Sequence, residues 1–295
     1  MGRSPGKRPK SRSTLVILLL MGGLFSAPVV TTQVTAAEVT AAEITPRIYV
    51  ASAANFYAPL KKLIADYQRT QDDTGEILIS TGSSGSLYRQ IKHGSPHQIF
   101  LSADSYYPEQ LELDQLIVPN SRRTYAIGEL LLWHPGVELD SLQQLSDYDL
   151  IVAIANPKTA PYGKAAQQVL KRLNPAMPWR LIIGASIAQT HQFVHSGNAP
   201  AGLISRSQID PNRTDVKTIP NNWYTPLIQQ MILTRKAEHH PKAHKLFAYL
   251  SSEPARRIIE ESGYLLPEIS TPSSESIAIP SDTMARDGMV QDSHP

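Results

Sequence analysis

Four short stretches of small and polar residues in this 295-residue chain have the composition of anion-binding junctions. In each, a predicted strand ends in small residues shortly before a predicted helix starts. They are Ala53-Ala54-Asn55, Gly82-Ser83-Ser84-Gly85, Ala160-Pro161-Tyr162-Gly163 and Gly184-Ala185-Ser186-Ile187. Parallel α/β sheets bind ligands beyond the carboxyl ends of their strands, where helix N-termini offer N–H groups and partial positive charge. The junctions therefore favour a site for an anion.

The donors at these junctions are neutral. Asn55, Ser83, Ser84 and Tyr162 each add an amide or hydroxyl group, no junction contains Arg, and only Lys164 lies close to one. A buried dianion is tolerated when its hydrogen bonds are complete, so such a site would bind a dehydrated dianion without charged side chains. The same residue types are also ordinary helix caps. Spacing alone leaves open whether the four junctions converge.

Two histidine pairs and one tyrosine pair offer alternative sites. His191 with His195, and His240 with His244, have helical spacing that suits a metal ion, but neither pair has a Cys or a third ligand nearby. We expect capping or solvated roles for them. Tyr106-Tyr107 could hold a ferric chelate, although aromatic packing against a helix explains the pair equally simply.

The serine loop suggests a distant alternative, an extracytoplasmic serine hydrolase that uses Ser84. Gly82-Ser83-Ser84-Gly85-Ser86 is similar to a nucleophile elbow, but that motif needs glycine where Ser86 stands. We therefore expect no enzyme activity. We also expect no cofactor and no direct cation ligand.

The two ends of the chain differ from its middle. Five basic residues between Arg3 and Arg12 precede the apolar stretch Thr14 to Val30, a pattern that predicts a signal peptide over residues 1–37, cleaved near residue 37 or 42. Residues 268–295 lack periodicity and predict a disordered tail. The chain has no Cys, hence no lipobox and no disulfide. A formal charge of +2 gives no indication of nucleic-acid binding.

Between these ends, strand-like and helical patterns alternate. This alternation predicts an α/β fold with mostly parallel sheets and helices on both faces. The expected strands are Arg47–Ala51, Glu76–Ser80, Gln98–Ser102, Glu129–Trp133, Leu150–Ala155, Ala201–Ile204 and Ile228–Leu233, and the last two expected helices lie around Lys242–Leu250 and Pro254–Glu261.

From about Arg47 to Pro267 the chain resembles the periplasmic molybdate-binding proteins of ABC importers. The stretches that carry the resemblance are Val50-Ala51-Ser52-Ala53-Ala54-Asn55-Phe56, Gly82 to Leu87, Phe100-Leu101-Ser102-Ala103-Asp104, Asn156 to Lys164, and Gly197 to Gly202. The resemblance implies a periplasmic, monomeric solute-binding protein of the two-lobed type II class with crossover hinge strands. It implies lobes over 47–125 plus 232–267 and over 126–231.

In that family the oxyanion, molybdate and also tungstate, sits between the lobes and is passed to a membrane permease. The resemblance implies that the ligand residues are Ala54, Asn55, Ser83, Ser84, Tyr162 and Ile187, with Ala54 and Ile187 acting through their backbones. Another oxyanion or a ferric chelate remains an alternative ligand. Ser205 stands where some members have a ligand-contacting Tyr, so Tyr162 is expected to replace that contact. His97-Gln98 also departs from the family pattern, without a functional explanation.

Overall fold

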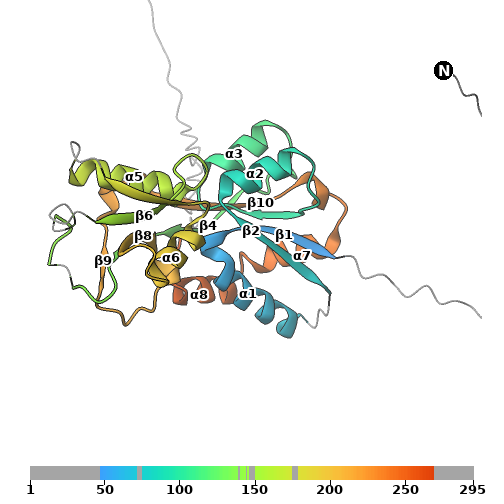
Figure 1. The fold of residues 1–295 in the computed structure, drawn as a ribbon. Helices are drawn as coiled ribbons and strands as arrows, with labels where there is room; N and C mark the ends of the chain where they lie inside the picture. Colours follow the sequence, from blue (N-terminus) through green and yellow to red (C-terminus); the bar gives the residue numbers. More distant parts are fainter. Residues whose placement is uncertain are drawn as a thin grey trace, which may run out of the picture. The chain divides into compact units, whose positions relative to one another are not determined.

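Two five-stranded sheets make up the part of the chain that the structure, a computed structural model, describes (Figure 1). This part comprises residues 47–71, 75–138, 140–143, 145, 150–174 and 179–268. The predicted signal peptide, and all of the predicted tail except Glu268, lie outside it. We call the parts built on the two sheets the first and the second lobe.

The first sheet has the strand order β2-β1-β3-β10-β4. Its strands are β1 (Ile48–Ala53), β2 (Ile77–Gly82), β3 (Ile99–Leu101), β4 (Arg123–Gly128) and β10 (Leu227–Leu233). The helices of this lobe are α1 (Tyr57–Thr70), α2 (Ser84–Lys92), α3 (Tyr106–Leu113), α7 (Pro241–Tyr249) and α8 (Glu253–Glu261), with the 3-10 turns η1 (Ala54–Phe56) and η4 (Arg235–Ala237).

The second sheet has the strand order β7-β6-β8-β5-β9. Its strands are β5 (Leu130–Trp133), β6 (Ile151–Ala155), β7 (Arg180–Gly184), β8 (Ala201–Ser205) and β9 (Val216–Thr218). The helices of this lobe are α5 (Pro161–Leu173) and α6 (Ile187–His195), with the 3-10 turns η2 (Arg206–Gln208) and η3 (Asn221–Trp223).

Alternation along the central strands separates two cores in each lobe. In β1, Val50 packs with α1, α7 and α8, whereas the next residue, Ala51, packs with α2 and α3 on the opposite face. In β6, Val152 lies on the α5 side and Ala153 on the α6 side. Successive strand side chains point to opposite faces, so strands covered on both sides are apolar throughout. Figure 1 shows these helices on the two sides of each sheet.

The α/β class and the two-lobed arrangement are confirmed, but the sheets are mixed rather than mostly parallel. In the first sheet β1 pairs in parallel with β2 and β3, whereas β10 runs antiparallel to β3 and β4. The second sheet repeats this division, with β6 parallel to its neighbours and β5 antiparallel. The antiparallel pairs arise because the chain passes directly between sheets, without a crossover helix, at these strands.

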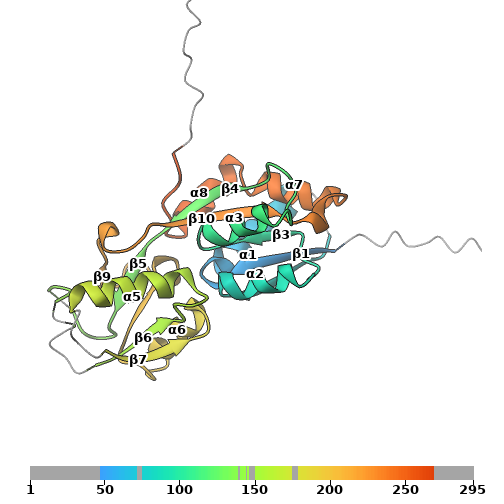
Figure 2. The same cartoon turned by 90° about the horizontal axis from the view of Figure 1, so that it is seen from above.

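The chain passes between the lobes twice. It leaves the first sheet after β4 and enters the second at β5, and it returns from β9 through η3 to β10 (Figure 2). Hydrogen bonding assigns both β4 and β10 to the first sheet. The predicted lobe limits at 125/126 and 231/232 fall inside these strands, and they remain a prediction about which parts move together.

All seven expected strands are present to within about two residues, and the two last helices are α7 and α8. The sequence did not predict β4, β7 or β9. The apolar run Leu181-Ile182-Ile183 of β7 was a possible strand signal, although the residues from Arg180 to Ile183 are exposed or half-buried in the structure. In the described part of the chain, no helix has the length and apolar character that crossing a membrane requires.

A hydrogen bond between α7 and α1 should make stability depend on pH. The Tyr249 hydroxyl donates to Asp66 Oδ2 over 2.5 Å, and this bond, with a second from Arg69, lowers the pKa of Asp66. Because the folded-state pKa is lowered, the stabilisation is present above the unfolded-state pKa and is lost as pH falls through the folded-state value.

We expect Tyr249→Phe to reduce the free energy of unfolding by about 1 kcal/mol near neutral pH and by much less once Asp66 is protonated. Urea unfolding at about pH 7 and about pH 2.5 measures both values. Tyr106→Phe is the matched control, since Tyr106 is 56% exposed and should lose nothing at either pH. An equal loss for Tyr249→Phe at both pH values would contradict this account.

Candidate functional site

All six residues implied as ligands line one small cavity of about 190 Å³. The rest of the described lining is Ala53, Gly82, Ala103, Ala160 and Pro161, so none of the described lining residues carries a charged side chain. That volume includes space open to solvent, so the room that these residues enclose is smaller still, against about 300–1,000 Å³ for the cavities of drug-sized ligands. This cavity therefore suits an ion of a few atoms. Its residues come from η1 and α2 in the first lobe and from α5 and α6 in the second.

The backbone N–H groups at these element starts are available as donors. Asn55 lies in η1, Ser84 and Ile187 are the first residues of α2 and α6, and Tyr162 is the second residue of α5. First-turn N–H groups have no acceptor within their own helix. Among the described residues, no backbone carbonyl in a loop or turn accepts a hydrogen bond from these four N–H groups. The cavity thus gathers the positive ends of several helices around one point.

The two serines of the α2 start differ in what their hydroxyl groups can offer. Ser84 Oγ accepts a hydrogen bond from the Ala103 N–H at 2.9 Å, which leaves the Ser84 hydroxyl proton for an anion. Ser83 Oγ instead donates to Ser86 Oγ at 2.9 Å. Ser84 is therefore the better side-chain donor of the pair, and Ser83 chiefly shapes the loop.

Direct hydrogen bonds join the two lobes beside the cavity. The Gly85 N–H donates to the Thr159 carbonyl at 2.9 Å, and Ser207 Oγ donates to the Asn55 carbonyl at 3.1 Å. A Cβ on Gly85 would lie 2.4 Å from the hydroxyl oxygen of Tyr107 and 3.0 Å from the Thr159 carbonyl oxygen. Gly85 is thus needed for the close approach of the α2 start to the loop before α5.

Gln229 on β10 connects the two lobes behind the cavity, and sequence reasoning missed it. Its Oε1 accepts from Asn55 Nδ2 and from the Tyr125 hydroxyl, both at 2.9 Å, and its Nε2 donates to the Tyr162 hydroxyl at 3.2 Å. Gln229 is completely buried. A glutamine within the apolar run Leu227–Leu233 was the signal that could have identified it.

Tyr162 lines the cavity, but its hydroxyl group is engaged on the side of the crossing strands. Besides Gln229, Ser205 Oγ donates to it at 2.9 Å. Burial raises the pKa of Tyr162 well above its ordinary value, so the phenol remains protonated. A role for the Tyr162 side chain at the ligand stays a prediction. Its backbone N–H has no loop acceptor among the described residues, and Ser205 supports the hydroxyl end of the ring.

His97 and Gln98, which depart from the family pattern, anchor the start of β3. Gln98 Oε1 accepts from the Tyr49 N–H at 2.7 Å, and the Thr234 hydroxyl donates to the His97 carbonyl at 2.6 Å. Neither residue lines the cavity. Their role is to fix strand ends in the first sheet.

The other histidines have structural contacts. His240 Nδ1 accepts from the Ala243 N–H as the N-cap of α7, and His244 Nε2 lies 2.9 Å from the Ala237 carbonyl. His191 stacks on Trp133 with ring centroids 5.1 Å apart, and His195 stacks on His191. No cluster of three or more potential metal-ligating residues occurs in the part of the chain that is described.

The ferric and hydrolase alternatives gain no support from the geometry. Tyr107 packs its ring on Tyr88 and Tyr106, with centroids 5.3 Å and 5.2 Å away. Burial raises the pKa of Tyr107 and so disfavours the phenolate that iron chelation needs. Among the described residues that line the Ser84 cavity there is no His, Asp or Glu to act as a base.

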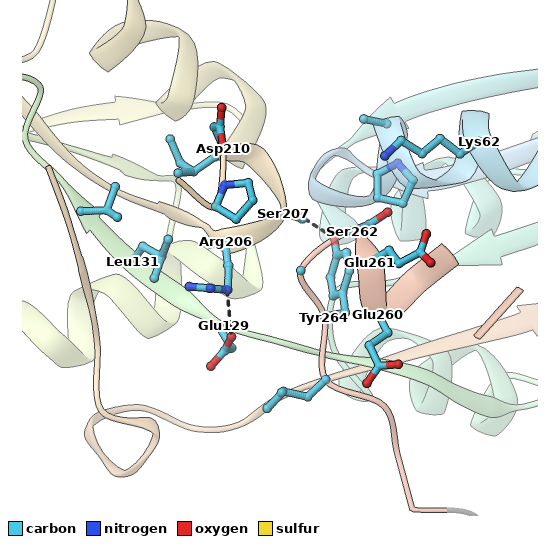
Figure 3. A pocket seen from close by; sticks show the side chains of 17 residues that line it. Lys62, Glu129, Leu131, Arg206, Ser207, Asp210, Glu260, Glu261, Ser262 and Tyr264 are labelled. Carbon is cyan, nitrogen blue, oxygen red and sulfur yellow. Dashed lines mark hydrogen bonds and ion pairs between the residues drawn. The ribbon is translucent and has the colours of Figure 1, made fainter. Parts of the chain in front are cut away.

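A larger hollow of about 1,490 Å³, open to solvent, lies on another side of the crossing strands (Figure 3). It is lined by side chains of both signs, including an Arg206–Glu129 ion pair of 3.5 Å. None of the six implied ligand residues lines it. At its edge the hydroxyl oxygens of Tyr264 and Ser207 lie 2.9 Å apart, and each lies within hydrogen-bond distance of the Asn55 carbonyl oxygen, at 3.0 Å and 3.1 Å. The hollow therefore lies next to the groups that hydrogen-bond to Asn55. Because it is open to solvent, it would not exclude water from a bound anion.

The chain is similar to known bacterial solute-binding proteins in sequence and in fold. A family model of bacterial extracellular solute-binding proteins matches residues 48–265. The molybdate-binding protein ModA of Azotobacter vinelandii is 40% identical over 227 residues, which are 74% of this chain and 89% of that protein. The ModA of Rhodobacter capsulatus is 34% identical over 223 residues, 74% of this chain and 88% of its own.

A solved structure shows the same fold. The periplasmic molybdate-binding protein of Azotobacter vinelandii superposes with a TM-score of 0.70 at 33% sequence identity, covering 75% of this chain and all of that one. The two-lobed arrangement is therefore shared over almost the whole of the described part of the chain.

Gly128 should be required for the contacts behind the cavity. A Cβ at this position would lie 2.2 Å from the Tyr162 hydroxyl oxygen and 2.5 Å from Gln229 Nε2. We expect Gly128→Ala to lower the free energy of unfolding by about 1–3 kcal/mol, the usual cost of overpacking. Gly82→Ala is the control, because its Cβ would make only ordinary 3.7 Å contacts with Leu87. If both variants had the same denaturation midpoint, the close packing of Tyr162 and Gln229 against Gly128 would be refuted.

Proposed function

Because this chain belongs to the bacterial extracellular solute-binding proteins, we propose that it captures molybdate between its two lobes and delivers it to the membrane permease of an ABC importer. Two relatives that are 40% and 34% identical to it over the aligned residues are named molybdate-binding proteins. Tungstate, of the same charge and tetrahedral shape, is a second ligand in this proposal. The protein acts as a monomer in the periplasm, exported by the segment over residues 1–37.

The observation that carries the proposal is the convergence of helix starts from both lobes on one cavity without charged side chains in its described lining. Backbone N–H groups of Asn55, Ser84 and Ile187 supply donors. The Ser84 hydroxyl, the Tyr162 N–H and the Ala54 backbone add to them in this proposal. A tetrahedral oxyanion presents four acceptor oxygens in the geometry that such a cage satisfies.

Neutral donors fit the ligand better than a cationic side chain would. Hydrogen bonds to a charged acceptor are worth about 1.5–3 kcal/mol each, so several together offset the loss of the dianion's hydration. Sulfate has the same charge and shape as molybdate. Discrimination therefore rests on cavity size and on how many donors reach the oxygens at once.

We expect purified protein to bind molybdate and tungstate tightly in isothermal titration and to bind sulfate far more weakly. Ser84→Ala should weaken molybdate binding about 10- to 100-fold, because it removes one hydrogen bond to a charged acceptor. Ser83→Ala is the matched control. Its hydroxyl is already engaged by Ser86, so its loss should be clearly smaller.

Equal affinity for sulfate and molybdate would refute the ligand assignment. If Ser83→Ala and Ser84→Ala weakened molybdate binding equally, the assignment of the side-chain donor would be wrong while the ligand assignment would stand. Ester hydrolysis that disappears in Ser84→Ala would replace the whole proposal with the hydrolase alternative.

A further inference from the structure

The side-chain amide of Asn55 has an unusual set of contacts. Its Nδ2 donates to Gln229 Oε1 and to the Tyr264 hydroxyl, both at 2.9 Å. Its Oδ1 is buried and has no hydrogen-bond partner among the described residues. Gln229 and Tyr264 lie outside the cavity lining, whereas Asn55 lines the cavity and is only 3% exposed. The atom of this amide left to face the cavity is therefore Oδ1.

This arrangement conflicts with binding an oxyanion. An amide oxygen is only an acceptor, so it repels the oxygens of an anion, and a buried acceptor without a partner costs about 1–3 kcal/mol. An amide turned by 180° exchanges oxygen and nitrogen in nearly the same volume. Turning Asn55 alone would bring its Oδ1 against Gln229 Oε1, so the two amides have to turn together.

We propose that Gln229 is a positioning residue for the oxyanion: its amide turns together with that of Asn55, so that Gln229 Nε2 donates to Asn55 Oδ1 and Asn55 Nδ2 is released to the ligand. The inference rests on the proposed function, because an oxyanion has to be the ligand.

Every neighbouring group remains satisfied after this paired turn. Asn55 Oδ1 accepts from Gln229 Nε2 and from the Tyr264 hydroxyl, whose proton turns away from the Asn55 carbonyl, and Ser207 Oγ still donates to that carbonyl. The second Nε2 proton goes to the Tyr125 hydroxyl, whose own proton then turns from Gln229 Oε1 to the Ser102 carbonyl, 3.1 Å away. Gln229 Oε1 then accepts from the Tyr162 hydroxyl, which continues to accept from Ser205. The one amide group without a protein partner is Asn55 Nδ2, at the cavity.

The location of Gln229 fits this role. It lies on β10, one of the two passages between the lobes, at the point where the register with β4 shifts between Gln229 and Gln230. Its amide contacts Asn55 of the first lobe and Tyr162 of the second. Because Gly128 on β4 has no side chain, the Tyr162 hydroxyl and the Gln229 amide can occupy the space beside it. One buried side chain thus links a donor residue of each lobe.

Gln229→Glu tests the orientation through pH. An ionised carboxylate has no donor, so it holds Asn55 Nδ2 and keeps Oδ1 toward the cavity. A protonated carboxyl can donate to Asn55 Oδ1 and restores the arrangement for binding. Buried Glu residues can titrate at about pH 8–9. We expect molybdate affinity of Gln229→Glu to be near wild type at about pH 6 and to fall about tenfold for each pH unit above the carboxyl's pKa.

The matched control is Gln230→Glu, the same change one residue further along β10. The Gln230 side chain contacts Arg122 and Thr124, away from the cavity lining, so this variant should follow the wild-type pH profile. Circular dichroism at each pH confirms that the variants are folded.

A double-mutant cycle separates positioning from simple charge repulsion. Gln229→Met should weaken molybdate binding in the wild type but add little in an Asn55→Ala background, since both changes remove the same donor.

Additive losses, or a flat pH profile for Gln229→Glu, would overturn the inference while molybdate binding by the wild type still upheld the proposed function. If the wild type binds only another oxyanion, the molybdate assignment fails and the same comparisons with that anion decide the role of Gln229. If it binds no oxyanion, both proposals fail.

Discussion

The proposed function places one constraint on the structure: a dianion taken out of water without a cationic partner needs a hydrogen-bond donor for nearly every lone pair it exposes. No single strand–helix junction can supply that many donors. Junctions from two lobes therefore have to meet at one point. The cavity of about 190 Å³ bounded by η1, α2, α5 and α6 is that meeting point. Larger or charged residues at Ala53, Gly82, Ala103 or Ala160 would fill the space or alter its charge.

The crossing strands follow from the same need. Two lobes that close on an ion have to be joined by segments that hold them in register, and β4 and β10 pair antiparallel with each other where the chain passes between sheets. Gly128 and Gln229 lie on these two strands. Gly128 has no side chain and so leaves space, and the amide of Gln229 hydrogen-bonds to residues of both lobes. The mixed character of the sheets is thus linked to how the lobes are joined.

Local features of the site could be predicted, and contacts between distant segments could not. Asn55, Ser84, Tyr162 and Ile187 each follow a strand and start a helix, a pattern that sequence shows directly. The bond from Asn55 to Gln229 joins residues 174 positions apart, which no local pattern encodes. The contacts of the Tyr162 hydroxyl with Gln229 and Ser205 were missed for the same reason: sequence places the residue at the junction but does not fix the direction of its ring.

The most direct test of the account is a crystal structure of the protein with molybdate, in which anomalous scattering locates the molybdenum. The account predicts the metal in the cavity among the four helix starts, with its oxygens about 2.7–3.1 Å from the N–H groups of Asn55, Ser84, Tyr162 and Ile187 and from Ser84 Oγ. An anion held by Arg or Lys, such as one bound in the hollow beside Arg206, would contradict the account.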